Sequence, residues 1–298
     1  MTAVLATATP AADIGERAPP AGAWRPVWKK LRRRRGAMIG LVVVVGFVVA
    51  ALFAPWLAPF DPVETSWSAI RQAPSAAHWF GTDDIGRDVL SRIVWGTRAS
   101  LLAGVVAVSI AVALGVPIGM TAGSVGGVVD ALISRLTDAF LACPFLILAI
   151  ALAAFLGPNL TNAMIAIGVS ATPIFVRLTR AQVINVKIEE YIEAARALGN
   201  SPLRIAWRHV LPNILAPVIV QATLAIAAAI IAEASLSFLG LGQQPPAPSW
   251  GSMLNTAKNY VDNAPWMAIW PGLAIFFLVL SFNLLGDGLR DALDPRRR

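Results

Sequence analysis

The stretch YIEAARALGNSPLRIAWRHVLPN, residues 191–213, is a charged segment inside a very apolar chain. Glu189 and Glu190, directly before this stretch, and Glu193 within it load the early turns of a helix, where the positive end of the dipole favours negative charge. Gly199 is a natural left-handed stop for this first helix. Ser201 followed by Pro202 is a typical N-cap and first-turn pair for a second one. The stretch therefore predicts two short helices that form an elbow between two longer apolar runs.

The first helix of this elbow carries an apolar stripe at helical spacing, made of Ile188, Ile192, Ala195 and Leu198 with Tyr191 and Ala194 beside it. Small side chains permit close approach, so such a helix is able to dock in the groove of a partner protein. The same pattern also suits a loop folded against its own helix bundle. The pattern alone does not separate these two interpretations.

The composition indicates that the surrounding chain is an all-α membrane protein. Of its 298 residues, 57% are hydrophobic and 14% are charged, whereas soluble domains are about 25% charged. A helix that spans a bilayer needs about 20 mostly apolar residues. We therefore expect six transmembrane helices, at residues 37–58, 100–122, 136–156, 162–178, 214–236 and 267–285.

The distribution of positive charge predicts the orientation of these helices. We let successive segments alternate between the two sides of the membrane. Of the 24 Lys and Arg residues, those on the side opposite the termini are then Arg71, Arg87, Arg92, Arg98 and Lys258. The excess of Lys and Arg marks the cytoplasmic side, so both termini and the elbow are expected there. The net charge of +7 is explained in this way. We expect the basic run at 29–35 to contact lipid headgroups, and we expect no nucleic-acid partner.

The chain accordingly divides into five expected parts. Residues 1–36 are a disordered basic cytoplasmic tail, 37–58 the first transmembrane helix, and 59–99 an external loop. Residues 100–288 form a core that contains a cytoplasmic loop at 181–213, and 289–298 are a basic cytoplasmic C-terminus. Within the external loop, residues 78–100 predict an interfacial helix, capped by Thr82 or Asp83 and carrying an Asp88–Arg92 pair at i,i+4.

Spacing also predicts one contact between helices. Gly115, Gly119 and Gly123 recur every four residues, and Ala111 extends the row backwards. A bare helix face of this kind allows close contact with another backbone. We therefore expect a packing seam along the second apolar run.

The residue types of a catalytic or metal centre are missing. No glycine-rich loop ends in Gly-Lys, so the chain lacks a Walker A phosphate cradle. His78 and His209 fall on opposite sides in the expected topology, so we expect no catalytic residue, metal or cofactor. Among the expected spans, Asp138 and Glu233 are the acidic residues. Glu233 either lines or gates a pathway, or is a rim carboxylate with local partners.

The segments EAARALG and HVLPN within the elbow resemble the EAA motif of ABC importer permeases. The matching residues are Glu193, Ala194, Ala195, Gly199, Leu211 and Pro212, and Leu198 lies in the same loop. His209 departs from the general pattern, which has isoleucine there. The segments FGTDDIGRDVLSR (80–92), AEASLSFLGLG (232–242), PSWGSML (248–254) and GDGLRDALDPR (286–296) are similar to the C-type permease of dipeptide and oligopeptide importers.

This resemblance implies one N-terminal helix plus the five-helix core of a type I ABC importer permease in the bacterial inner membrane. In that family the EAA loop forms a coupling helix. It implies a paralogous permease, two cytoplasmic ATP-binding subunits and an external or periplasmic substrate-binding protein as partners. ATP hydrolysis is then expected in the partners, so the chain itself is not an enzyme. Di- or oligopeptides are the implied substrates, with nickel or another small solute as the alternative.

Two other classes remain as rivals. An ion-coupled secondary transporter would keep working without ATP, but such proteins usually hold more charged residues inside the membrane. A membrane enzyme would need a catalytic constellation, and none is visible in this sequence.

Overall fold

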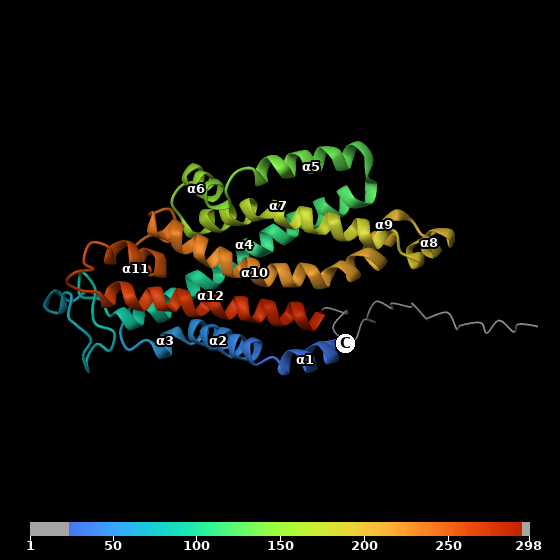
Figure 1. Ribbon diagram of the computed structural model, residues 1–298. Helices are drawn as coiled ribbons and strands as arrows, with labels where there is room; N and C mark the ends of the chain where they lie inside the picture. Colours follow the sequence, from blue (N-terminus) through green and yellow to red (C-terminus); the bar gives the residue numbers. More distant parts are fainter. Residues whose placement is uncertain (1–23, 294–298) are drawn as a thin grey trace, which may run out of the picture.

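In the computed structural model, which describes residues 24–293, the chain folds as an elongated bundle of helices (Figure 1). Residues 1–23 and 294–298 lie outside this description. The described residues contain no β-strand, only an isolated bridge between Thr82 and Asp88. The elements are α1 (Trp24–Arg32), α2 (Arg35–Leu52), α3 (Ala54–Leu57), η1 (Trp67–Ala69), α4 (Val89–Val125), α5 (Gly127–Leu141), α6 (Phe145–Leu156), α7 (Leu160–Lys187), α8 (Glu190–Ala197), α9 (Pro202–Ile205), η2 (Ala206–Val210), α10 (Leu211–Phe238), α11 (Trp250–Ala257) and α12 (Trp266–Leu293).

Five segments are long and apolar enough to cross a membrane: α2, α4, α7, α9 to α10 taken together, and α12. A sixth span results if the bent pair α5 and α6 is counted as one. The expectation of an all-α membrane protein is thereby confirmed. Most helices extend beyond the apolar runs that predicted them, because the polar turns at their ends continue the same backbone hydrogen bonds.

The third expected span, at 136–156, is not one straight helix. Helix α5 ends at Leu141, α6 begins at Phe145, and the two axes differ by 88°. Pro144 explains the break, since a proline has no N–H to donate and disfavours helical geometry at the residue before it, here Cys143. The apolar composition continues through the bend, so hydropathy does not reveal it.

Helices α4 and α7 pack against each other along the predicted glycine seam. A Cβ placed on Gly115 would lie 2.6 Å from Cβ of Phe175, and one on Gly119 would lie 2.5 Å from the carbonyl oxygen of Val176. Such distances are too short for any side chain, so the two backbones are in direct contact. The predicted seam is confirmed, and its partner is α7.

The helix predicted over 78–100 is wrong in its first half. Helix α4 begins only at Val89, with Asp88 as its N-cap. The side chain of Asp83, a predicted cap, instead pairs with Arg87 at 2.6 Å and with Arg92 at 3.5 Å. The predicted Asp88–Arg92 pair is likewise replaced, since the Asp88 carboxylate accepts from Ser91. Asp83 also accepts from the backbone N–H groups of Ile85 and Arg87, so its side chain closes a loop where the local pattern predicted a helix.

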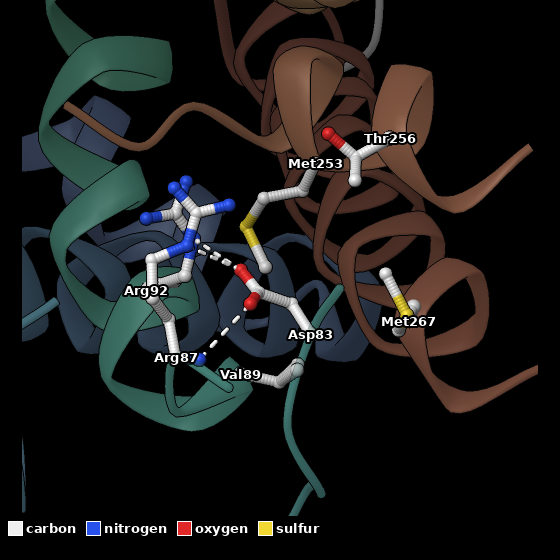
Figure 2. A pocket seen from close by; sticks show the side chains of 7 residues that line it. All are labelled: Asp83, Arg87, Val89, Arg92, Met253, Thr256 and Met267. Carbon is white, nitrogen blue, oxygen red and sulfur yellow. Dashed lines mark hydrogen bonds and ion pairs between the residues drawn. The ribbon is translucent and has the colours of Figure 1, made fainter. Parts of the chain in front are cut away.

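Residues 58–88 and α11 form what we call the distal cap, at the end of the bundle opposite α8 and α9 (Figure 1). Figure 2 shows the Asp83 carboxylate directed toward Arg87 and Arg92, with Met253 of α11 close by. Arg92 also donates to the carbonyl of Pro62 at 2.7 Å. Nearly buried charges of this kind are stable only when they are paired, so the network fixes the loop on the start of α4.

The expectation that residues 1–36 are a disordered tail is also wrong in part. From Trp24 onward the chain is helical, as α1 and the start of α2, and only residues before this lie outside the description. Likewise α12 continues to Leu293, so part of the expected C-terminal tail is helix. Helix α1, the end of α12 and the elbow all lie at the same end of the bundle (Figure 1).

Candidate functional site: the elbow and a buried carboxylate

The elbow has the predicted two-helix form. Its helical part, residues 190–210, consists of α8, α9 and η2, and its last residues begin α10. Helix α8 ends where Gly199 takes a φ of +77°. A Cβ there would meet no heavy atom within 4 Å, so the backbone angle and not crowding requires glycine. The Asn200 amide N–H donates back to the carbonyl of Ala195 at 3.2 Å, which closes the helix end.

The second half of the elbow begins as predicted and then widens. The Ser201 hydroxyl accepts from the backbone N–H of Arg204 at 3.4 Å, as an N-cap does. Helix α9 passes into the π-helix η2, in which the N–H of Leu211 donates to the carbonyl of Ala206. Pro212 has no N–H to continue the regular ladder, so the wider turn lies directly before it.

The apolar stripe of α8 is divided between two faces. The side chains of Ile192 and Ala195 are buried, at 0% and 5% exposure, and pack into the bundle core. By contrast, Ile188 and Leu198 are 79% and 83% exposed. The stripe therefore attaches α8 to its own bundle through the first pair and presents the second pair outward.

The other motif residues of the elbow follow this division. Glu193, Ala194 and Gly199 are exposed on α8 or its end, whereas Leu211 and Pro212 start α10. Partial burial raises the pKa of the Tyr191 hydroxyl, and the nearby Glu189 carboxylate acts in the same direction, so this side chain stays neutral at physiological pH. The outward face of α8 thus carries acidic, small and apolar side chains together with Arg196.

A cavity of about 140 Å³ lies between the elbow and the ends of α4 and α7. Its wall is mainly apolar, with Val183, Ile192 and Ile205 among its lining residues. The ammonium of Lys187 donates to the carbonyl of Ser124 at 2.7 Å and so joins the ends of α7 and α4 beside it. Empty volume next to α8 leaves the elbow room to shift against the bundle.

Glu233 lies fully buried in α10, at 0% exposure, toward the end that carries the distal cap. Ser237 donates to its Oε1 at 2.7 Å, and Ser100 of α4 donates to its Oε2 at 3.2 Å. The Ser237 oxygen in turn accepts from the backbone N–H of Gln243 at 3.1 Å. One carboxyl group therefore links α4, α10 and the loop that follows α10.

The expected absence of metal and catalytic clusters can be examined only for residues 24–293. In that part of the chain no group of three or more His, Cys, Asp or Glu side chains is placed to hold a metal ion. His78 lies 3.0 Å from Asp88 in the distal cap, while His209 lies in η2. The sequence did not reveal the Ser100–Glu233 contact, and no local pattern could have done so.

Comparison with protein families gives two matches along the chain. Residues 115–298 match the family described as binding-protein-dependent transport system inner membrane component. Residues 22–74 match the N-terminal TM domain of oligopeptide transport permease C. The two matches cover the elbow, Glu233 and the first span.

Curated proteins of similar sequence carry the names of peptide transport permeases. The chain is 49% identical over 275 residues to the dipeptide transport system permease protein DppC of Alkalihalophilus pseudofirmus, covering 92% of this chain and 90% of that protein. It is 47% identical over 274 residues to the glutathione transport system permease protein GsiD of Shigella flexneri, with the same coverage. For the di/tripeptide transport system permease protein DppC of Pseudomonas aeruginosa the identity is 46% over 275 residues, covering 90% and 91%.

Among solved structures, the fold is similar to a chain of the MetNI methionine ABC transporter in inward facing conformations. The TM-score is 0.58 at 20% sequence identity, over 69% of this chain and 97% of that one. At this identity the similarity concerns the fold of the bundle alone.

Proposed function

Because the chain belongs to the family of binding-protein-dependent transport system inner membrane components, we propose that it forms half of the pathway by which an ABC importer moves di- or oligopeptides. The other half is a paralogous permease, so that the two chains form a heterodimer. Two ATP-binding subunits lie on the elbow side, and a substrate-binding protein docks at the distal cap. Both termini are then cytoplasmic, in the inner membrane of a bacterium.

The observation that carries this proposal is the outward face of α8. Leu198, Leu203 and Trp207 of this charged elbow are 83%, 69% and 60% exposed. Several large apolar side chains exposed on one short segment are typical of a surface that a partner protein covers. On the same helix, Ala194 and Ala197 are exposed and small enough to let α8 enter a groove, and Glu193 is exposed beside them. We assign this face, from Glu193 to Gly199, to contact with an ATP-binding subunit.

Transmission of force follows from the way in which the elbow joins the bundle. Ile192 and Ala195 fix α8 to the core, and η2 passes without interruption into α10. A displacement of α8 therefore moves the start of α10, and the cavity beside it accepts the change of shape. A two-state pathway needs only a few kcal/mol of differential contact to change its preferred state.

Glu233 is proposed as a positioning residue for the opposite end of the pathway. In this conformation the Glu233 side chain is fully buried within the chain, so it does not line a passage at the chain's surface. Its three-way link instead fixes the loop after α10 relative to α4. Gating through this link is consistent with its place beside the distal cap.

Peptides are preferred over nickel or another small solute because similar curated proteins are named for dipeptides, di/tripeptides and glutathione, which is itself a tripeptide. An ion-coupled mechanism is disfavoured, since family members are named for their dependence on a binding protein. The substrate is selected largely by that external partner.

The proposal is tested with the importer reconstituted in liposomes with its ATP-binding subunits and binding protein. We expect di- or oligopeptide uptake that needs internal ATP and survives an uncoupler. Uptake that collapses with the uncoupler while ATP is present would contradict the ABC mechanism. Uptake of a nickel complex and not of peptides would contradict the substrate assignment alone.

A further inference from the structure

The sequence between α1 and α2 concentrates positive charge at one place. Every residue from Lys29 to Arg35 is cationic except Leu31, and no acidic residue occurs between Trp24 and Phe60. All of these cationic side chains are exposed. We call this surface the basic collar, defined as Lys29, Lys30, Arg32, Arg33, Arg34 and Arg35.

The collar is held in a fixed position by packing against the last turns of α12. Leu31 and Ala37 are buried in a cluster with Ala292. A Cβ on Gly288 of α12 would lie 3.2 Å from Leu31, which shows how closely the helices approach. The apolar face of α1 is therefore already occupied by the chain itself, and the cationic face points away from the bundle.

Within residues 24–293, two contacts of these cationic side chains help to define the surface. Arg34 lies 3.1 Å from the Asp291 carboxylate, which anchors the turn between α1 and α2 to α12. The guanidinium of Arg32 lies 6.0 Å from the ring centre of Trp28, which is itself 47% exposed. A cluster of like charges this dense repels itself unless anions are close.

The place of the collar identifies the chemistry of its partner. The membrane-spanning part of α2 begins at Arg35, so the collar lies where the first span leaves the hydrocarbon. Clusters of four to eight Lys or Arg directly beside a span bind anionic lipid headgroups. Trp28 is the residue type that prefers the same interfacial layer.

From this arrangement we infer that the basic collar binds the phosphate groups of anionic phospholipids in the adjacent leaflet. Bound lipid then clamps α1 and α2 to the end of α12, because the collar belongs to the first two helices and its Arg34 pairs with Asp291 of the third. The α2 and α12 helices pack along one another, so the clamp stabilises the side of the bundle that lies away from the α4–α7 seam.

The test uses the assembled importer in nanodiscs of phosphatidylcholine with or without phosphatidylglycerol. Phosphatidylglycerol molecules retained per complex are counted by native mass spectrometry, at low and high salt. The variant with Lys29→Gln, Lys30→Gln, Arg32→Gln and Arg33→Gln should retain severalfold fewer of them. Retention by the parent protein should fall at high salt, because the attraction is electrostatic.

Two control variants separate charge from folding. Arg32→Lys with Arg33→Lys keeps the charge and should retain phosphatidylglycerol like the parent. Arg135→Gln with Lys258→Gln removes two cations elsewhere and should have no effect. Inorganic phosphate added to the complex in phosphatidylcholine nanodiscs should not raise its thermal stability, whereas phosphatidylglycerol should.

Two outcomes would overturn the inference. One is equal phosphatidylglycerol retention by the parent and the neutralised variant. The other is chemical cross-linking of Lys29 or Lys30 to an ATP-binding subunit at the same yield in both kinds of nanodisc, since a protein would then cover the collar.

Discussion

The Ser100 hydroxyl of α4 donates to Glu233 Oε2 of α10 across 3.2 Å, although the two residues are 133 positions apart in the sequence. This bond joins α4 to α10 toward the distal end of the bundle, and Ser237 donates to the other carboxyl oxygen. It makes the stability of the distal end depend on one buried acid. The first prediction concerns that acid.

Replacing Glu233 by Ala should destabilise the protein by about 2–4 kcal/mol, because it leaves two buried hydroxyls without an acceptor and opens a cavity. Glu233→Gln keeps the shape and one acceptor oxygen, so its loss should be markedly smaller. Thermal unfolding of the assembled permease measures both. Equal melting temperatures for Glu233→Ala and the parent would show that the hydrogen bonds of Glu233 do not stabilise the protein.

Replacing Leu198 by Asp should uncouple the importer without unfolding it. The side chain is 83% exposed, so the bundle loses little, while the proposed contact with the ATP-binding subunit gains an unfavourable charge. We expect ATPase stimulation by the loaded binding protein to fall by about tenfold or more, at an unchanged melting temperature. Leu198→Met is the matched control. Normal stimulation in Leu198→Asp would contradict the docking assignment.

Gly199→Ala tests the turn of the elbow. The φ of +77° costs a residue with a Cβ about 1 kcal/mol, and open space around it removes any clash as an explanation. Hydrogen exchange of residues 190–210 should become faster, while the rest of the protein is unchanged. Gly199→Asn should be milder, since asparagine tolerates this angle better. Unaltered exchange in Gly199→Ala would show that the turn carries no strain.

Gly119→Ala tests the α4–α7 seam. The added Cβ would meet the carbonyl oxygen of Val176 at 2.5 Å, so the helices must separate, at a cost of about 1–3 kcal/mol. Gly46→Ala in α2 is the control, because a Cβ there meets nothing within 4 Å. That change should be neutral or stabilise by about 0.5–1 kcal/mol. Similar melting temperatures for the two variants would argue against direct backbone contact.

Asp88→Ala tests the start of α4. The carboxylate accepts from the backbone N–H and the hydroxyl of Ser91, both at 2.8 Å. Loss of this cap should cost about 1–2 kcal/mol. Asp88→Asn retains an acceptor oxygen and should recover most of the stability, as measured by thermal unfolding. If Asp88→Ala were as stable as the parent, Arg92 and not Asp88 would hold the distal cap to α4.

Features that depend on neighbours in the sequence could be predicted. Gly199 and the Ser201-Pro202 pair fixed the elbow because each acts on its own backbone. The four-residue spacing of Gly119 and its neighbours indicated a seam, but it did not say that Val176 would be opposite. Apolar runs located the spans but not the helix ends, since α4 begins eleven residues before the expected position 100. At Pro144 a bend occurs inside a continuous apolar run.

Features that depend on distant residues could not be predicted. Asp83 satisfied the local rules for a helix cap, yet its partner Arg92 also bonds to the carbonyl of Pro62, 30 positions away, and so holds this segment in a loop. The α8 stripe satisfied the helical period, but only the bundle shows that Ile192 faces inward and Leu198 outward. Glu233 was left with two interpretations because its acceptor role depends on Ser100, from another helix.

The unbroken length of α4, from Val89 to Val125, has a mechanical consequence. At about 1.5 Å per residue it is a rod of about 55 Å, almost twice the thickness of the hydrocarbon layer. One tip carries the ion-paired loop, and the other borders the hollow beside Lys187. Helix α4 continues through Pro117 without a break. If it tilts as one body, its two ends move in opposite directions, so binding of solute at one face displaces the other without a chain of side-chain rearrangements.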